Sequence, residues 1–244
     1  MKLFEPYKYN ELIFPNRIIR SATFEGMADA NGYPSQNYTD FYSNLSRKHN
    51  GAIITGFVYV NENGKAMQPG QAGLDSDVKI KEFQKTAAAV HKNKGKILIQ
   101  LAHTGRQSVS SVTGGQLWGL SAKKSSYFNE IPSILSKQQL YQIVEDFSNA
   151  AMRAQTAGFD GIQLHAAHGY LIHQSVLPSI NNRTDEFGVD PHYGIGIHLL
   201  HLIIESVKQK CSDNFPVLIK ISGSDDYFNS FKKIEFLNLI RFLN

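Results

Sequence analysis

The stretch Gly161-Ile162-Gln163-Leu164-His165-Ala166-Ala167-His168-Gly169-Tyr170 joins a short apolar run to two imidazoles and a phenol. The run Gly161–His165 predicts a β-strand that passes directly into a polar loop. Ile, Leu and Val also dominate four other short runs, which predict strands at Arg17–Thr23, Ala52–Gly56, Lys96–Leu101 and Val217–Ser222. Because these runs are nearly continuous instead of alternating with charge, they are typical of parallel strands covered on both faces.

Helical segments separate the predicted strands. The clearest begins at Ser136, which forms a capping box with Gln139, and it keeps apolar residues at a spacing near 3.6 until Gly158. Similar spacing predicts helices over residues 38–45, 83–90 and 195–210, and a further helix that begins near Lys232. This alternation of strand and helix predicts an α/β protein, either a closed barrel or an open doubly wound sheet.

The loops favour the barrel over the open sheet. A long loop rich in Ser and Gly follows the third strand, from His103 to Pro132, and barrels place their function on loops at the carboxyl ends of the strands. A doubly wound nucleotide-binding sheet usually carries a glycine-rich fingerprint after its first strand. The segment Ser21-Ala22-Thr23-Phe24-Glu25-Gly26 does not match such a fingerprint.

The bulk composition excludes several classes of protein. With 244 residues, of which 42% are hydrophobic, the chain can bury a sizeable core. A net charge of +4 without a basic stripe argues against a nucleic-acid partner. Cys211 is the single cysteine, which favours a reducing compartment, and no stretch reaches 18 uninterrupted apolar residues. We therefore expect a cytoplasmic protein that does not span a membrane.

Two imidazoles and a phenol follow the fourth predicted strand. In a barrel, His165, His168 and Tyr170 would project into the mouth, where their donors can converge on a ligand oxygen. A His-x-x-His pair alone leaves three interpretations open: buried structural histidines, a metal site, or a site for an organic ligand. The metal interpretation needs a third protein ligand, for which Asp185 is the nearest acidic candidate.

Two further polar residues lie in predicted strands. Gln100 closes the third strand, and Lys220 lies between apolar neighbours in the fifth. Burying a lysine is costly unless it finds an anion or an electron-rich partner. Lys220 therefore indicates a ligand, or alternatively a lysine at a strand end that pairs with Asp225 or Asp226.

Four motifs, taken in order along the chain, carry a family resemblance. They are Leu3-Phe4-Glu5-Pro6 with Pro15-Asn16-Arg17-Ile18-Ile19-Arg20-Ser21-Ala22-Thr23, then Gln100-Leu101-Ala102-His103-Thr104-Gly105-Arg106-Gln107, then Leu164-His165-Ala166-Ala167-His168-Gly169-Tyr170-Leu171, and finally Asn182-Arg183-Thr184-Asp185. In order and spacing the chain resembles NADH:flavin oxidoreductases of the old yellow enzyme family. The resemblance implies FMN as cofactor, NADH or NADPH as hydride donor, and a small α,β-unsaturated carbonyl compound as substrate.

The resemblance also implies roles for individual residues. Six would contact the flavin: Ser21, Ala22, Thr23, Gly56, Gln100 and Lys220. Gln100 would hydrogen-bond the pyrimidine edge of the ring, and Lys220 would stabilise negative charge on the reduced ring. His165 and His168 would bind the substrate carbonyl oxygen, and Tyr170 would deliver a proton. This scheme needs no metal.

The fold implied by the resemblance is an FMN-binding (β/α)8 barrel of the TIM type with an N-terminal hairpin cap. Members of the family continue past a fifth strand, so we expect residues 1–244 to be the N-terminal part of one barrel domain, with about five of eight βα units. The loops that hold the phosphate, which follow strands seven and eight, would then be missing. Two alternatives remain: a truncated or split-gene remnant that needs a separate chain to supply strands, and a metal-dependent hydrolase using His165 and His168.

Overall fold

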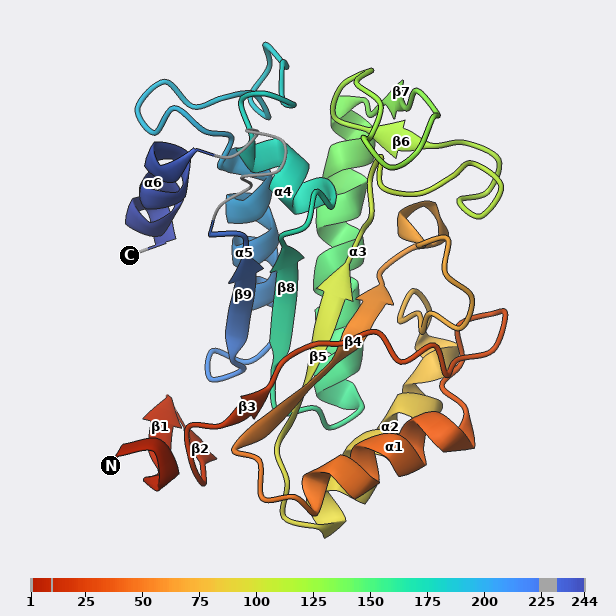
Figure 1. Ribbon diagram of the computed structural model, residues 1–244, viewed down its shortest axis with the longest axis vertical. Helices are drawn as coiled ribbons and strands as arrows, with labels where there is room; N and C mark the ends of the chain where they lie inside the picture. Colours follow the sequence, from red (N-terminus) through yellow and green to blue (C-terminus); the bar gives the residue numbers. More distant parts are fainter. Residues whose placement is uncertain (1, 10, 224–231, 244) are drawn as a thin grey trace.

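A five-stranded parallel sheet forms the centre of the computed structural model, which describes residues 2–9, 11–223 and 232–243 (Figure 1). Its strand order, β3-β4-β5-β8-β9, follows the chain without reversal. A doubly wound sheet reverses its strand order at a switch point, whereas a barrel wall adds each strand beside the last. The barrel-type fold predicted from the sequence is therefore confirmed, as a partial barrel in the described residues.

The central strands are β3 (Ile19–Arg20), β4 (Ala52–Tyr59), β5 (Ile97–Ala102), β8 (Ile162–Ala166) and β9 (Val217–Ile221). The helices are α1 (Gln36–Ser46), α2 (Ile80–Lys92), α3 (Lys137–Thr156), α4 (Leu171–Val176), α5 (His198–Lys210) and α6 (Lys233–Leu243). Two small sheets pair β1 (Tyr7–Tyr9) with β2 (Leu12–Phe14), and β6 (Trp118–Gly119) with β7 (Ser133–Ile134). Short 3-10 turns cover Lys2–Phe4, Glu62–Gly64 and Asp77–Lys79.

The predicted helices are present, and local signals explain where they begin. At the start of α3, the Ser136 hydroxyl accepts a hydrogen bond from the Gln139 backbone N–H, and the Gln139 side chain accepts one from the Ser136 N–H. This reciprocal capping box satisfies two backbone donors that a helix otherwise leaves unpaired. Helix α3 runs behind the sheet next to α5, so both cover the outer face of the barrel wall (Figure 1).

Two predicted strand boundaries need correction, and two elements were not predicted. The first strand was expected over residues 17–23, but β3 contains only Ile19–Arg20, because the chain leaves the sheet from Ser21 onward. The second strand was expected to end at Gly56, but β4 continues to Tyr59, with a register shift against β5 between Ile54 and Phe57. Helix α4 after the histidine motif was not predicted, and the predicted loop from 103 to 132 contains β6.

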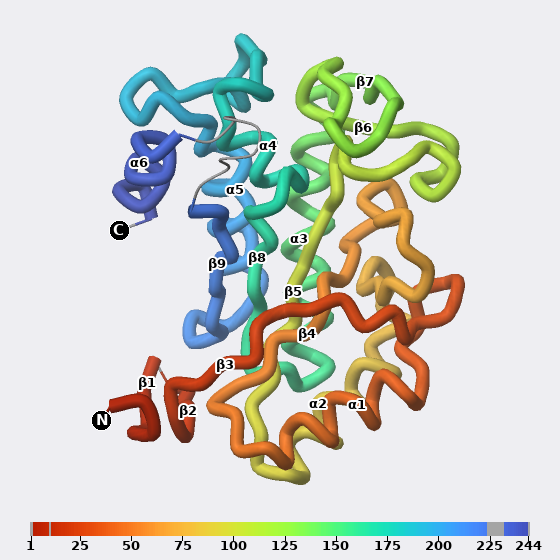
Figure 2. The backbone as a smooth tube through the Cα atoms, in the orientation of Figure 1, coloured from red at the N-terminus to blue at the C-terminus, as the bar shows by residue number. Residues whose placement is uncertain are grey.

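Two hydrophobic cores lie on opposite faces of the sheet. The larger lies between the sheet and the helices and includes Ile99, Leu164 and Phe147, all fully buried. The smaller lies on the inner face, where Ile54 and Leu98 pack against residues of β2. Figure 2 shows the β1-β2 hairpin at the amino ends of the strands, so the predicted hairpin cap is confirmed.

The outermost strands are less covered than the central ones. Among the described residues β3 and β9 have one neighbouring strand each, and none of their residues is fully buried. The prediction that all five strands are covered on both faces is therefore wrong for these two. Between the hairpin and β9 lies an apolar pocket of about 400 Å³, lined by Tyr7, Tyr9, Phe14, Asn16, Arg17, Ile19, Val217 and Leu218. Within the described chain, no helix is both long and apolar enough to cross a bilayer.

Candidate active site

The carboxyl ends of three neighbouring strands bring together the polar residues that interrupt their apolar sequences. Gln100 of β5 lies opposite Gln163 of β8, and its side-chain amide donates a 2.6 Å hydrogen bond to the Gln163 side-chain oxygen. His165, two residues further along β8, lies opposite Lys220 of β9. Because residues two apart in a strand share a face, these side chains line one inner surface.

Lys220 is half-buried, and loss of hydration lowers the pKa of its ammonium group. It makes no hydrogen bond to another described residue. Asp225 and Asp226, the alternative partners considered above, lie outside the described residues. The predicted need of this lysine for an anionic or electron-rich partner therefore stays a prediction.

The two imidazoles and the phenol predicted to act together are brought together by a tight turn after β8. The ring centre of His165 lies 5.1 Å from that of His168 and 4.6 Å from that of Tyr170. His168 and Gly169 both have left-handed backbone conformations, with φ of 57° and 75°. Such a conformation costs energy for a residue with a side chain and is concentrated at functional sites. An added Cβ at Gly169 would also overlap the end of the Gln107 side chain, which would have to shift.

Burial fixes the protonation states of this cluster. Desolvation, followed by the neighbouring charges of His168 and Lys220, lowers the pKa of His165 to about 3, so the imidazole is neutral at neutral pH. Its Nδ1 accepts a long hydrogen bond of 3.4 Å from the Ala167 N–H, which leaves the proton on Nε2. Burial raises the pKa of Tyr170 to about 12, so its phenol keeps its proton. The cluster therefore offers two uncharged donors.

Phe57 belongs to this cluster, although the sequence analysis missed it. Its ring centre lies 5.5 Å from that of Tyr170, 6.2 Å from that of His165 and 5.2 Å from that of Phe24. The register shift between Ile54 and Phe57 inserts one extra residue into β4, and such a bulge redirects the following side chain. The signal available in the sequence was the isolated Gly56 within an apolar run.

The predicted cofactor contacts after β3 are partly open. Ser21 and Thr23 are exposed, and no hydrogen bond within the described chain uses the backbone N–H groups of Ala22, Thr23 and Phe24. Gly56 is needed for a reason that the sequence did not show: an added Cβ would overlap the Glu25 carboxylate. The role of Gly56 beside a flavin stays a prediction.

Glu25 is a second residue that the sequence analysis missed. Desolvation raises the pKa of its carboxyl to about 7, against the opposing effects of hydrogen bonds and of the Arg20 charge. Its Oε2 is buried without a hydrogen-bond partner among the described residues. No sequence motif marked it, because its burial depends on contacts with the distant residues Tyr42 and Gly56.

Comparison with known proteins assigns the family. The family model described as "NADH:flavin oxidoreductase / NADH oxidase family" matches residues 2–243. The chain belongs to this family. The family resemblance predicted from the four motifs is thus confirmed.

Relatives and solved structures agree with the family assignment. The chain is 32% identical over 223 residues to a "Metal reductase" of Desulforamulus reducens, covering 91% of this chain and 33% of that protein. It is 32% identical over 225 residues to an "NADPH dehydrogenase" of Listeria monocytogenes, covering 92% of this chain and 64% of that protein. The old yellow enzyme homologue from Zymomonas mobilis superposes with a TM-score of 0.88 at 27% identity, over 99% of this chain and 69% of that one. The chain thus spans between a third and two thirds of these two curated relatives.

The polar end of the inner face fits the ring of FMN, the cofactor of this oxidoreductase family. A flavin ring presents carbonyl oxygens and ring nitrogens along one edge, which need amide and cationic donors. Gln100 of β5 and Lys220 of β9 supply such donors from either side of β8, and the open N–H groups of Ala22 and Thr23 supply more. The donor chemistry of the described residues therefore matches the ring of the cofactor.

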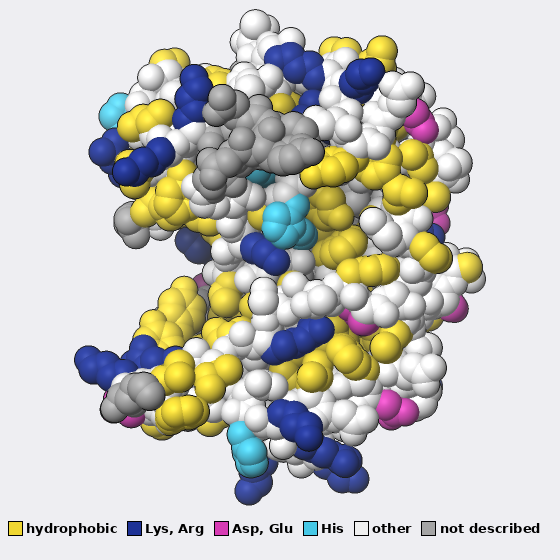
Figure 3. Space-filling model, in the orientation of Figure 1, with side chains coloured by type: hydrophobic (Ala, Val, Ile, Leu, Met, Phe, Trp, Pro, Cys, Tyr) yellow, Lys and Arg dark blue, Asp and Glu magenta, His cyan; other side chains and the backbone are white. Residues whose placement is uncertain are grey.

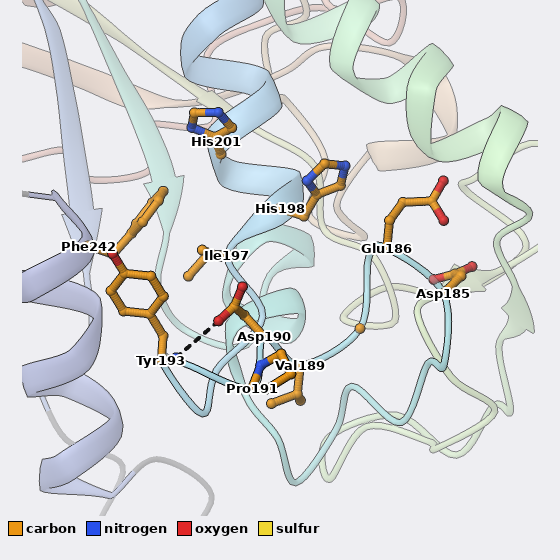
Figure 4. Close-up of a pocket in the computed structure, with 11 residues that line it drawn as sticks. Asp185, Glu186, Val189, Asp190, Pro191, Tyr193, Ile197, His198, His201 and Phe242 are labelled. Atoms are coloured by element: carbon orange, nitrogen blue, oxygen red, sulfur yellow. Dashed lines mark hydrogen bonds between the residues drawn. The ribbon is translucent and has the colours of Figure 1, made fainter.

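The metal interpretation loses its third ligand in the structure. Asp185 forms a bidentate ion pair with Arg183, with N···O distances of 3.0 and 2.5 Å. The described residues contain no group of three His, Cys, Asp or Glu that could hold a metal ion. A pocket of about 470 Å³ near Asp185 opens between the segment 185–197, α5 and α6 (Figure 4). Its other carboxylates are also engaged: Glu186 pairs with Lys137, and Asp190 accepts from backbone N–H groups.

Proposed function

We propose that this chain carries the flavin-ring and carbonyl-binding part of an FMN-dependent ene-reductase. The reaction would take hydride from NADH or NADPH and reduce the activated C=C bond of an α,β-unsaturated carbonyl compound. The observation that supports this proposal best is the convergence of His165, His168 and Tyr170 at the carboxyl end of β8, next to Gln100 and Lys220.

The two imidazoles would bind the substrate carbonyl oxygen. His165 is neutral and carries its proton on Nε2, so it can donate a hydrogen bond without a counter-ion. Burial and the Lys220 charge lower the pKa of His168, which keeps the second imidazole neutral as well. Two donors to a carbonyl oxygen stabilise the negative charge that develops there when hydride reaches the β-carbon.

Tyr170 would supply the proton. Its raised pKa keeps the phenol protonated at neutral pH, and its ring lies beside that of His165, which binds the carbonyl. Protonation of the α-carbon completes the addition of one hydride and one proton across the double bond. The bound FMN would supply the hydride, and Gln100 and Lys220 would orient its ring.

The direct test is flavin binding followed by turnover. Titration of the chain with FMN, followed by fluorescence quenching, should show saturable binding that weakens about tenfold or more in Lys220→Gln. Lys92→Gln removes a charge from an exposed position on α2 and serves as the control. The flavin-loaded protein should oxidise NADH or NADPH faster when 2-cyclohexen-1-one is added. Equal FMN affinity in both lysine variants would contradict the proposed ring site.

The proposal includes a separate chain that supplies further strands. Two observations support it: the outer edges of β3 and β9 are unpaired within the described chain, and an apolar pocket lies between β9 and the hairpin. Unpaired edges of a parallel sheet recruit other strands. Co-expression with the C-terminal third of a family member should increase the FMN affinity if this is correct, and unchanged affinity would contradict it.

A further inference from the structure

A basic pocket of about 590 Å³ adjoins the candidate active site. It is lined by Arg106, Gln107, Lys123, Lys124, Ser126, Tyr127, His168, Gly169, His173, Leu177, Ser179, Ile180 and Ser222. Three of these side chains are cations, and no Asp or Glu is among the described residues that line it. His168 belongs both to this pocket and to the proposed carbonyl site. Figure 3 shows histidine side chains at the centre of this face with basic side chains near them.

Neutral oxygens, not carboxylates, hold the three cations in place. Arg106 donates to the backbone carbonyls of Lys123 and Lys124 at 3.0 and 3.2 Å. The Lys123 ammonium donates to the Ser179 carbonyl at 2.6 Å, and that of Lys124 to the Asn129 side-chain oxygen at 3.0 Å. In the part of the chain that the structure describes, none of the three forms an ion pair. Among the described residues, the pocket therefore brings three positive charges together without a carboxylate that neutralises them.

The arrangement leaves donors that a ligand can use. Arg106 Nε is buried and has no hydrogen-bond partner among the described residues. Loss of hydration lowers the pKa of the Arg106 guanidinium, because burial disfavours its charged form. An oxyanion placed in the pocket would offset both the desolvation and the mutual repulsion of the cations.

We infer that this pocket is an anion subsite of the active site, which binds a phosphate or carboxylate group of a molecule whose reacting end lies at His165 and His168. The inference rests on the proposed function for that reacting end. Two sources share the chemistry: the pyrophosphate of a nicotinamide dinucleotide, and an anionic tail on the unsaturated acceptor. Because His168 lies on the boundary of both sites, one molecule can occupy them together.

The first experiment tests the subsite without flavin. Calorimetric titration of the chain with pyrophosphate should give an affinity that falls about fivefold in Lys124→Gln, the loss expected for one partly screened charge, and further in Arg106→Gln. Lys92→Gln, on the exposed surface of α2, should change it by less than twofold. Lys124→Gln leaves the contacts of Arg106 intact, so it separates charge from loop folding. Equal affinity in Lys124→Gln and Lys92→Gln would overturn the subsite.

The second experiment identifies the source, with FMN present. ADP-ribose probes the dinucleotide, and the pair 3-(4-hydroxyphenyl)propanoate and 4-propylphenol probes an anionic tail against a neutral one. The ligand that belongs to the subsite should lose about fivefold in affinity in Lys124→Gln, while 4-propylphenol should not change. If neither anionic ligand is affected, the subsite does not serve the reacting molecule. Loss of 4-propylphenol binding in His165→Ala tests the proposed function separately, so the two ideas can fail independently.

Discussion

The two ends of the sheet's inner face carry opposite chemistry. At the amino ends of the strands, Ile54, Leu98 and Leu218 pack with the hairpin in a small apolar core. Two residues further along β5 and β9, at Gln100 and Lys220, the same face is polar. Residues two apart are separated by roughly 7 Å along a strand. Packing and chemistry are thus divided within single strands, so substitutions at the two ends should have separable effects.

The largest effect should come from the polar end, through Tyr170→Phe. The change removes the proposed proton donor while keeping the ring that packs beside His165 and Phe57. We expect reduction of an enone by the flavin-loaded protein to slow by about 10²–10⁴-fold, and flavin reduction by the nicotinamide to change little, because only enone reduction needs a proton. Stopped-flow traces of each half-reaction provide the measurement. Tyr141→Phe on α3 is the control, and equal slowing of both half-reactions would remove Tyr170 from this role.

At the apolar end, Leu98→Ala should lower stability and leave ligand chemistry intact. Leu98 is fully buried in the inner core, and truncating such a leucine costs about 2–5 kcal/mol of unfolding free energy. Urea denaturation followed by circular dichroism measures the loss. Leu237→Ala, at a residue 39% exposed on α6, should cost much less. A Leu98 variant with unchanged stability but altered ligand binding would break the division between the two ends.

At the polar end, His165→Ala and His168→Ala should each weaken the binding of a phenol to the flavin-loaded protein. Each change removes one donor to the ligand oxygen, worth about 1.5–3 kcal/mol if that oxygen is charged, or about 10–150-fold in affinity. Spectrophotometric titration of a long-wavelength charge-transfer band follows the binding. His201→Ala, on the exposed surface of α5, should leave the affinity unchanged. Unchanged titrations in the double variant would contradict the proposed carbonyl site.

The residues that could be predicted from the sequence are those whose signals are local. The capping box of α3 and the cluster after β8 each lie within a few residues, so the sequence marked both, and the family resemblance supplied the roles expected of the cluster. Phe57 and Glu25 could not be predicted in the same way. Phe57 turns into the site because of a bulge defined against β5, and Glu25 is buried by contacts with α1 and β4. The incomplete cover of β9 likewise depends on neighbouring strands, which its own apolar sequence cannot reveal.

The smallest effect is expected at Glu25, and it appears in the pH dependence of stability. The fold raises the pKa of this carboxyl to about 7 from an ordinary value of 4.5, mainly by desolvation. Between pH 4.5 and 7 the folded state therefore holds a proton that the unfolded state has lost, so stability falls as the pH rises through this window. Because Glu25 is only partly shielded from water, we expect a change on the order of 1 kcal/mol.

Glu25→Gln should abolish the contribution of this carboxyl to the slope. The unfolding free energy of the variant, compared with that of the parent protein, should therefore be higher at pH 8 than at pH 5. Glu62→Gln, at an exposed position, should keep the slope. His103 and His165, whose pKa values burial lowers to about 3, act in the opposite direction by reducing stability below pH 6.5. The comparison of each variant with the parent protein cancels the contribution of these histidines. The unfolding free energy is measured by urea denaturation at each pH. If it has the same pH dependence in Glu25→Gln and in the parent, the fold does not raise the pKa of this carboxyl.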